Sequence, residues 1–329
     1  MWTAAVAAAA LFLSGAPLAA ARAGQPGVPG QPAPPPGPAP VPAVASGVRS
    51  AADVQILLDR VNFSSGVVDG TFGENTRKAV AAFQEAHDLP VTGEVDELTW
   101  QNLLAASGAK PWVPYAITEQ DAGGPFYQIP ADVTEQAKLP ALGYRSLLEM
   151  LEERFHTSEK LLREHNPDSH FAAGETLSVP NVRHPPTTAT ASPETVRVVV
   201  SKSRLTLTVD NGDDLLFFAP VSAGSEHDPL PLGTWQVRSV DRNPAFFYNP
   251  QLFWNADPRS AKAKLAPGPN NPVGVVWIDL SKEHYGIHGT PEPGRIGTTF
   301  SHGCVRLTNW DALTVASLVK PGTAVVFEP

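Results

Sequence analysis

Apolar residues recur at helical spacing in three successive stretches between residues 47 and 108. The first begins at Ser50 with the sequence SAAD, which resembles a capping box with Asp53 in the Glu/Gln place. The second follows the glycine-rich turn GVVDGTFGENT, and the third begins at Asp96, a good N-cap residue. We therefore predict a small all-α domain of three helices over residues 47–108. Its core positions are expected to be Val54, Leu57, Leu58, Val61, Ala79, Val80, Phe83, Trp100, Leu103 and Leu104.

The pattern between residues 116 and 183 is mixed. Two short helical patterns begin at Ser146, with Glu149 three residues on, and near Thr157. The sequence NPD then interrupts the chain, and ETLSVP is typical of a short strand. We predict a small α+β module here, followed by a linker over residues 184–194.

Residues 195–329 alternate apolar and polar side chains, as β-strands do. The first two strands meet at Asn211-Gly212, the strongest short hairpin signal. Further strand patterns occur in GTWQVRSV, VGVVWIDL, HYGIHG and TAVVFEP, and one helix is expected from about Asn309 to Leu318. This region is predicted to be a predominantly β domain.

Composition and the N-terminal sequence indicate an exported, multidomain protein. The 329 residues suffice for two or three domains, and a net charge of −9 argues against a nucleic-acid partner. Residues 1–23 combine a short apolar run with an A-x-A pattern, typical of a signal peptide, and residues 24–46 form a Pro-rich linker. No integral membrane domain is expected after signal removal. Because no Lys or Arg precedes the apolar run, an N-terminal anchor is the alternative.

The chain has a single cysteine, Cys304, which cannot form an internal disulfide. A lone thiol in an exported protein points to chemical reactivity, and a nucleophilic thiol needs a base. Strand alternation in HYGIHG places His284 and His288 on one face, with Tyr285 and Ile287 on the other. His288 could then face Cys304 across the intervening loop and serve as that base.

The motif HG, a loop, and then SHGCVRL resembles the YkuD-type L,D-transpeptidases, as do VRVVVSKSRLTLTV, PLGTWQV and PGPNNPVG. The resemblance implies a YkuD-like β-sandwich over residues 195–329. It implies that Cys304 is the nucleophile, His288 the general base, and the Gly289 carbonyl the group that orients the imidazole. The usual Thr-Pro-x-Gly loop is replaced by Pro231-Leu232-Gly233. The resemblance also implies that Ser301, His302 and Gly303 line the site, that the 302–304 backbone forms an oxyanion hole, and that Arg306 holds a substrate carboxylate.

Two further resemblances concern the first half of the chain. The three-helix region is similar to the type-1 peptidoglycan-binding domain, which implies a binding role for its D-G-x-F-G-x-x-T element. The module over 116–183 resembles a LysM module, which binds glycan, although LGYRS replaces the usual glycine-aspartate-threonine entry; a helical spacer is the alternative. The motif residues of the first domain are Asp69, Gly70, Phe72, Gly73 and Thr76.

Other interpretations of the same residues stay open. Cys304 could be a small buried side chain, or could join His284, His288 and His302 in a zinc site. An aromatic segment before the predicted catalytic strand either packs against the sheet or covers the substrate cleft. Its members are Phe246, Phe247, Tyr248, Phe253 and Trp254, of which Phe247, Tyr248 and Trp254 are the substrate-binding candidates.

The resemblance implies an exported, periplasmic L,D-transpeptidase in cell-wall biogenesis and cell shape. A thioester forms on the L-centre of the third stem residue, D-alanine leaves, and an amine of a second stem attacks. Its partners would be peptidoglycan stem peptides and glycan strands, and a carbapenem could form an adduct. An alternative is a carboxypeptidase or cross-link hydrolase that uses water; another is a non-catalytic wall-binding scaffold. No metal or other cofactor is expected.

Overall fold

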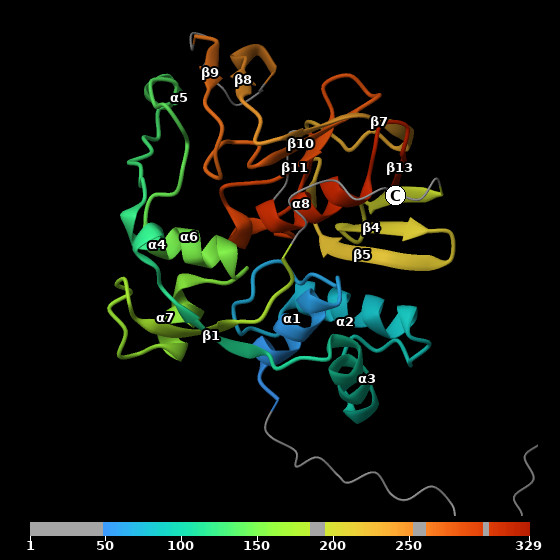
Figure 1. The fold of residues 1–329 in the computed structure, drawn as a ribbon. Helices are drawn as coiled ribbons and strands as arrows, with labels where there is room; N and C mark the ends of the chain where they lie inside the picture. Colours follow the sequence, from blue (N-terminus) through green and yellow to red (C-terminus); the bar gives the residue numbers. More distant parts are fainter. Residues whose placement is uncertain (1–48, 185–194, 253–260, 299–302) are drawn as a thin grey trace, which may run out of the picture. The chain divides into compact units, whose positions relative to one another are not determined.

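The computed structural model shows a helical region, a mixed region and a β-rich region in that order along the chain (Figure 1). The predicted signal peptide (1–23), the Pro-rich linker (24–46) and most of the second linker (184–194) lie outside the described residues. In the part that is described, no helix has the length and apolar character needed to cross a membrane. The structure describes residues 49–184, 195–252, 261–298 and 303–329.

The N-terminal helices begin where their capping residues predict. The Ser50 hydroxyl accepts a hydrogen bond from the Asp53 N–H (3.0 Å), and the Asp53 carboxylate accepts one from the Ser50 N–H (3.4 Å). The Asp96 carboxylate accepts a hydrogen bond from the Thr99 N–H at 2.7 Å. Phe83 is fully buried among apolar residues of all three helices. The helices are α1 (Ala51–Arg60), α2 (Glu74–Ala86) and α3 (Glu97–Ser107).

The middle region is closed by a two-stranded antiparallel sheet whose strands lie at its two ends. The two predicted helices are present and follow the N-caps Ser146 and Ser158. An insertion with two short helices precedes them, so the order is β-α-α-α-α-β. The elements are β1 (Trp112–Ala116), α4 (Glu119–Gly123), α5 (Val133–Gln136), α6 (Leu147–Arg154), α7 (Glu159–His165) and β2 (Thr176–Pro180).

The alternating pattern of the C-terminal region forms one large sheet, and Asn211-Gly212 lies at a hairpin turn as predicted. The turn joins the second and third strands of the region, however, and not the first two. The stretch expected to form the first strand is divided at residues 202–205 into two antiparallel strands, Val196–Ser201 and Thr206–Asn211. Its nine strands are β3 (Val196–Ser201), β4 (Thr206–Asn211), β5 (Asp214–Pro220), β6 (Ser222–Ala223), β7 (Gly233–Arg242), β10 (Val276–Leu280), β11 (Gly286–His288), β12 (Val305–Arg306) and β13 (Ala324–Glu328). Their order is β5-β4-β3-β13-β7-β10-β11-β12-β6. Because only Val221 separates β5 from β6, at opposite ends of this order, the sheet curves back into a nearly closed form.

The predicted C-terminal helix, α8 (Asn309–Leu318), packs on this sheet. Val315 of α8 is fully buried in the same apolar cluster as Val198 and Ile278 of the sheet. A separate hairpin of β8 (Phe246–Tyr248) and β9 (Ala263–Leu265) contacts α5, and the three elements lie together in Figure 1. Two short 3-10 helices are η1 (Pro250–Leu252) and η2 (Pro293–Arg295).

A buried network of charges joins the described regions. The Arg183 guanidinium donates to Asp59 of α1 and to Asp311 of α8, and the Arg183 N–H donates to Asp59 at 2.9 Å. His156 Nδ1 lies 3.1 Å from Asp59 Oδ2, and the Ser64 hydroxyl donates to Asp311 at 3.0 Å. The described residues accordingly pack as one unit.

Candidate active site

Strands β11 and β12 bring the predicted nucleophile and base to one face of the sheet. The strands are parallel, with Ile287 paired with Val305 and His288 with Arg306. Ile287 and Val305 are fully buried in the core. Because side chains alternate along a strand, Cys304, His288 and Arg306 share the opposite face. All three line one cleft of about 730 Å³.

His288 is held as a neutral imidazole. Its side chain is buried, and Nδ1 lies 2.7 Å from the carbonyl oxygen of Gly289, which can only accept a hydrogen bond. Nδ1 therefore carries the proton, and Nε2 keeps its lone pair. Burial, followed by the positive charge of Arg306, lowers the pKa of His288 to about 3, although the hydrogen bond to Gly289 opposes this. The imidazole is thus ready to accept a proton at neutral pH.

Cys304 rests as a thiol in the same cleft as His288. Burial raises the pKa of the Cys304 thiol, while a hydrogen bond from the Gly286 backbone and the charge of Arg306 oppose the rise. The sulfur also lies 3.8 Å from the backbone carbonyl oxygen of His284. The resting forms of the two groups are therefore thiol and imidazole rather than thiolate and imidazolium.

Two glycines permit close packing at the site. A Cβ added at Gly289 would lie 2.1 Å from the Asn309 side-chain oxygen, so no larger residue fits beside the carbonyl that orients His288. Gly303 has a φ of +92°, and a Cβ there would lie 2.7 Å from the Tyr285 ring. The positions before Cys304 and after His288 thus both need glycine.

Aromatic and apolar side chains from distant segments form the cleft walls. Phe247 and Tyr248 of β8 line the cleft, and Phe247 is 69% exposed, so it does not serve as a core residue. Trp277 of β10 stacks on His288 with ring centroids 5.5 Å apart. Val133 of α5 also lines the cleft, so the insertion of the middle region borders the same cavity as Cys304.

The expectation that Tyr285 faces away from His284 and His288 is wrong. Only Gly286–His288 of the HYGIHG segment is a strand, because His284 adopts a left-handed conformation with a φ of +67°. This residue breaks the period-two alternation on which the expectation rested. Tyr285 therefore lines the cleft together with His284 and His288 instead of facing away from them.

Sequence reasoning missed several cleft residues because they come from a loop, a strand and a short helix that have no local motif. Asp228, Trp277 and Val133 are the examples, and only the folded sheet brings them together. Three predicted site residues, Ser301, His302 and Trp254, lie outside the described residues.

The motif residues of the N-terminal domain surround a buried glutamine. The Gln55 side chain donates to the Asp69 carboxylate (2.9 Å) and the Thr76 hydroxyl (3.1 Å), and it accepts from the Gly70 N–H (2.9 Å). Asp69, Gly70 and Thr76 therefore hold the turn in shape. The turn borders a groove of about 410 Å³. The other two motif residues are Phe72, which is half-buried, and Gly73, the N-cap of α2.

Comparisons with known proteins match two separate regions of the chain. A family model described as "L,D-transpeptidase catalytic domain" matches residues 194–327, and one described as "Putative peptidoglycan binding domain" matches residues 50–103. The "Putative L,D-transpeptidase YkuD" of Bacillus licheniformis is 31% identical over 55% of this chain and 93% of its own length. The protein of the same name in Bacillus subtilis is 30% identical over 52% of this chain and 87% of its own length. A solved L,D-transpeptidase from Mycobacterium smegmatis is 21% identical, with a TM-score of 0.34, over 41% of this chain and 59% of that one.

The family models and the Bacillus relatives define a class of enzymes that cross-link peptidoglycan. Within that class, the chain belongs to the YkuD family of L,D-transpeptidases. It carries a peptidoglycan-binding domain on the N-terminal side of its catalytic domain. The comparisons thus agree with the expected type-1 peptidoglycan-binding and YkuD resemblances.

Proposed function

We propose that Cys304 transfers a stem-peptide acyl group through a thioester. The sulfur attacks the carbonyl carbon that links the L-centre of the third stem residue to the terminal D-alanine, and the thiol proton passes to His288 Nε2. The carbon–nitrogen bond breaks as His288 protonates the departing D-alanine amine. An amine of a second stem then attacks the thioester, which breaks the carbon–sulfur bond and returns the proton to the thiolate.

The observation that carries this proposal is the shared cleft of a neutral His288 and a thiol Cys304. A base with a low pKa is unprotonated at neutral pH and can take the thiol proton as the sulfur attacks. The negative oxygen of the intermediate needs N–H donors, and the backbone of residues 302–304 is the proposed oxyanion hole.

We infer that Arg306 holds a carboxylate of the donor stem. Arg306 pairs with His288 in the strand register and lines the cleft, so its guanidinium lies beside the reacting atoms. Guanidinium–carboxylate pairing is strong and directional. Phe247 and Tyr248 would contact apolar parts of the stem from the opposite wall, and Trp254 is proposed to join them.

Intact-mass spectrometry with a carbapenem tests the nucleophile. The β-lactam ring is an activated amide, so the Cys304 thiol should open it and gain the mass of one carbapenem. Cys304→Ala should show no gain, and His284→Asn should react as the wild type does. An adduct that persists in Cys304→Ala would refute the assignment.

Replacement of His288 tests its proposed role as the general base. His288→Gln keeps a polar side chain of similar size but has no basic nitrogen, so kcat on a soluble tetrapeptide donor should fall by about 10²–10⁴. Product analysis separates the two acyl acceptors: cross-linked dimers support transfer to an amine, whereas tripeptide alone supports the hydrolytic alternative. Near-wild-type turnover of His288→Gln would contradict the proposed role.

We further propose that the groove beside the D-G-x-F-G turn binds peptidoglycan. Thr71 lies at this turn, is exposed and lines the groove, whereas Phe72 does not line it. Thr71→Val should reduce co-sedimentation with purified sacculi, while Leu98→Ala, a change at an exposed apolar residue on α3, should not. If both variants lose sacculus binding equally, the groove is not the binding site.

Export to the bacterial periplasm is proposed from residues 1–46 and from the nature of the substrate. Cell fractionation of the full chain tests it, because accumulation in the cytoplasm alone would be inconsistent with a wall enzyme.

Glycan binding by residues 116–183 is proposed from the LysM resemblance, and binding of soluble chito-oligosaccharides to the full chain is the measurement that checks it.

A further inference from the structure

Trp277 and Arg306 flank His288 in a row that runs across three strands. Trp277 of β10 is paired with His288 of β11, which is paired in turn with Arg306 of β12. The Cβ atoms of an opposed antiparallel pair are about 5 Å apart, so an indole can reach the neighbouring ring. The indole of Trp277 and the imidazole of His288 are stacked, with centroids 5.5 Å apart and ring planes at 24°. The imidazole therefore lies against an aromatic ring that the proposed mechanism does not use.

The strand that carries His288 has a glycine where the indole lies. A Cβ added at Gly286 would be 2.6 Å from the Trp277 ring. Gly286 and His288 are two residues apart, so their side-chain positions share one face of β11. The backbone of Gly286 is not left-handed and does not itself require glycine. The close approach of the indole accounts for the glycine, and a larger residue would displace the ring from His288.

The stack supplies a restraint on His288 that its hydrogen bond lacks. The hydrogen bond from Nδ1 to the Gly289 carbonyl, at 2.7 Å, fixes one atom of the imidazole but leaves the ring free to swing about that contact. A second ring packed against the imidazole fixes its plane. Together the two contacts fix Nε2, the nitrogen that takes the thiol proton in the proposed mechanism. Catalytic groups need such restraint, because a displacement of about 1 Å can cost about 10²-fold in rate.

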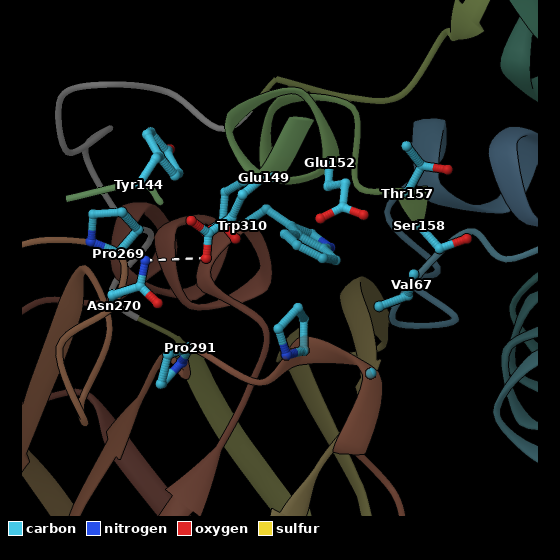
Figure 2. A pocket seen from close by; sticks show the side chains of 13 residues that line it. Val67, Tyr144, Glu149, Glu152, Thr157, Ser158, Pro269, Asn270, Pro291 and Trp310 are labelled. Carbon is cyan, nitrogen blue, oxygen red and sulfur yellow. Dashed lines mark hydrogen bonds between the residues drawn. The ribbon is translucent and has the colours of Figure 1, made fainter. Parts of the chain in front are cut away.

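The segment that holds Nδ1 is packed independently of the indole. The Asn309 side chain of α8 lies beside Gly289, where an added Cβ would be 2.1 Å from the side-chain oxygen. Figure 2 shows Pro291, from the same segment, on the wall of a second pocket of about 220 Å³. Neither His288 nor Trp277 lines that pocket. Replacement of Trp277 should therefore remove the stack and leave the hydrogen bond to Gly289 in place.

We propose that Trp277 is a positioning residue for His288: its indole fixes the plane of the imidazole and keeps water from its face. The inference rests on the proposed role of His288 as the general base. Trp277 acts through His288 and takes no part in bond making. Burial is the largest cause of the low pKa of His288, and the indole supplies part of that burial. Loss of the indole should therefore raise the pKa of His288 towards the usual value of about 6.5.

The charged and titratable groups near His288 stay unchanged in the test. Arg306, on the β12 side of the imidazole, lowers the pKa of His288 by its positive charge. Asp241 of β7 and Asp279 of β10 lie on the same face of the sheet as Trp277. The described residues that line the cleft with His288 add Asp228, Lys282, Glu283, His284, Tyr285 and Cys304. A rise in the pKa of His288 in a Trp277 variant thus reports the loss of the indole.

Kinetics with a soluble tetrapeptide donor test the positioning role. Trp277→Leu keeps an apolar side chain but removes the flat ring, so kcat should fall about 10- to 100-fold. KM should change less than about twofold, because the indole is not proposed to bind the donor. Trp277→Phe keeps a smaller ring against His288 and should retain kcat within about threefold. Trp100→Leu is the matched control: Trp100 is also half-buried, lies on α3 and should leave kcat unchanged.

NMR of the full-length protein reads the pKa of His288 without turnover. The imidazole C–H signal of His288 is assigned by its absence in His288→Gln. The pKa should rise above about 4 in Trp277→Leu and stay near the wild-type value in Trp277→Phe and Trp100→Leu. Gly286→Ala displaces the indole without removing it, and it should affect kcat and the pKa as Trp277→Leu does. Thermal unfolding checks that each variant folds.

The proposal is overturned if the pKa of His288 is unchanged in a folded Trp277→Leu protein. It is also overturned if only KM rises, because the indole would then contact the donor instead. If Trp277→Leu does not fold, Gly286→Ala decides by the same two criteria. A different result bears on the proposed function: if the pKa rises but His288→Gln keeps wild-type turnover, His288 is not the base, while the effect of Trp277 on His288 stands.

Discussion

At the scale of single residues, the proposed chemistry depends on a histidine that stays neutral because it is buried. The pKa of His288 lies at about 3, below the usual value of about 6.5 for histidine, so the base form is already present well below neutral pH. Burial also raises the pKa of Cys304, so the thiol form persists above neutral pH. The lowered pKa of His288 and the raised pKa of Cys304 widen the pH range in which the imidazole is unprotonated and the thiol is intact.

We therefore expect kcat/KM to change little between about pH 5 and pH 8, with no inflection near pH 6.5. Activity should fall in acid only as His288 gains its proton near pH 3. The measurement is a pH profile of kcat/KM with a soluble tetrapeptide donor. His284→Asn serves as the control because it removes the other cleft histidine and tolerates the left-handed backbone. An inflection near pH 6.5 that survives in this control would show that His288 titrates normally.

That Cys304 and His288 line one cleft was predictable, whereas the rest of the cleft was not. Both residues lie within one contiguous segment, and the resemblance of its motif to the YkuD family placed them together. Asp228 and Val133 lie far from that segment and carry no pattern that links them to it. Tyr285 was misplaced because a single left-handed residue, His284, reverses the alternation, and periodicity does not reveal such a residue.

At the scale of elements, long periodic stretches were predictable and short ones were not. The strand β3, the helix α8 and the hairpin at Asn211-Gly212 follow clear patterns. Strands β6 and β12 have two residues each, which is too few to show a period. They nevertheless form the end of the sheet, and β12 places Arg306 opposite His288. The insertion before α6 likewise gives no sign in the sequence that it borders the catalytic cleft.

The insertion docks through a glycine in the turn after β9. The Leu142 N–H donates to the Pro267 carbonyl and the Asn270 N–H donates to the Leu142 carbonyl, both at 2.9 Å. A Cβ at Gly268 would lie 2.2 Å from the Leu142 carbonyl oxygen, and Gly268 has a φ of +143°. Gly268→Ala should therefore displace the insertion and Val133 from the cleft wall. We expect KM for a stem-peptide donor to rise several-fold, with a smaller change in kcat.

Steady-state kinetics on Gly268→Ala measures this effect, and Gly212→Ala is the matched control. Gly212 also has a positive φ (+72°), but nothing lies within 4 Å of its added Cβ, so it carries the backbone strain without the clash. An unchanged KM in a folded Gly268→Ala protein would mean that the insertion does not contact the donor.

At the scale of the whole molecule, Arg183 links the N-terminal helices to the catalytic domain. Its guanidinium pairs with Asp59 of α1 and Asp311 of α8, and it lies 5.1 Å from the centre of the Phe217 ring. Burial alone would raise the pKa of Asp59, but Arg183 and His156 hold it below its usual value. Burial raises the pKa of Asp311 even though Arg183 opposes the rise. The two carboxylates thus share the guanidinium of Arg183, and Asp59 also contacts His156.

Arg183→Met keeps much of the side-chain volume but leaves two buried carboxylates without their cation, which should cost about 3–5 kcal/mol in the free energy of unfolding. Urea denaturation followed by far-UV circular dichroism measures this loss. The matched control is Arg197→Met, which removes a surface pair with Asp210 and should cost less than about 1 kcal/mol.

Because Arg183 joins α1 to α8, its loss should also split one cooperative transition into two, with the N-terminal helices unfolding first. A single transition with wild-type stability would mean that the domains are held together by apolar contacts, such as those of Phe218 with the helices, and not by this network.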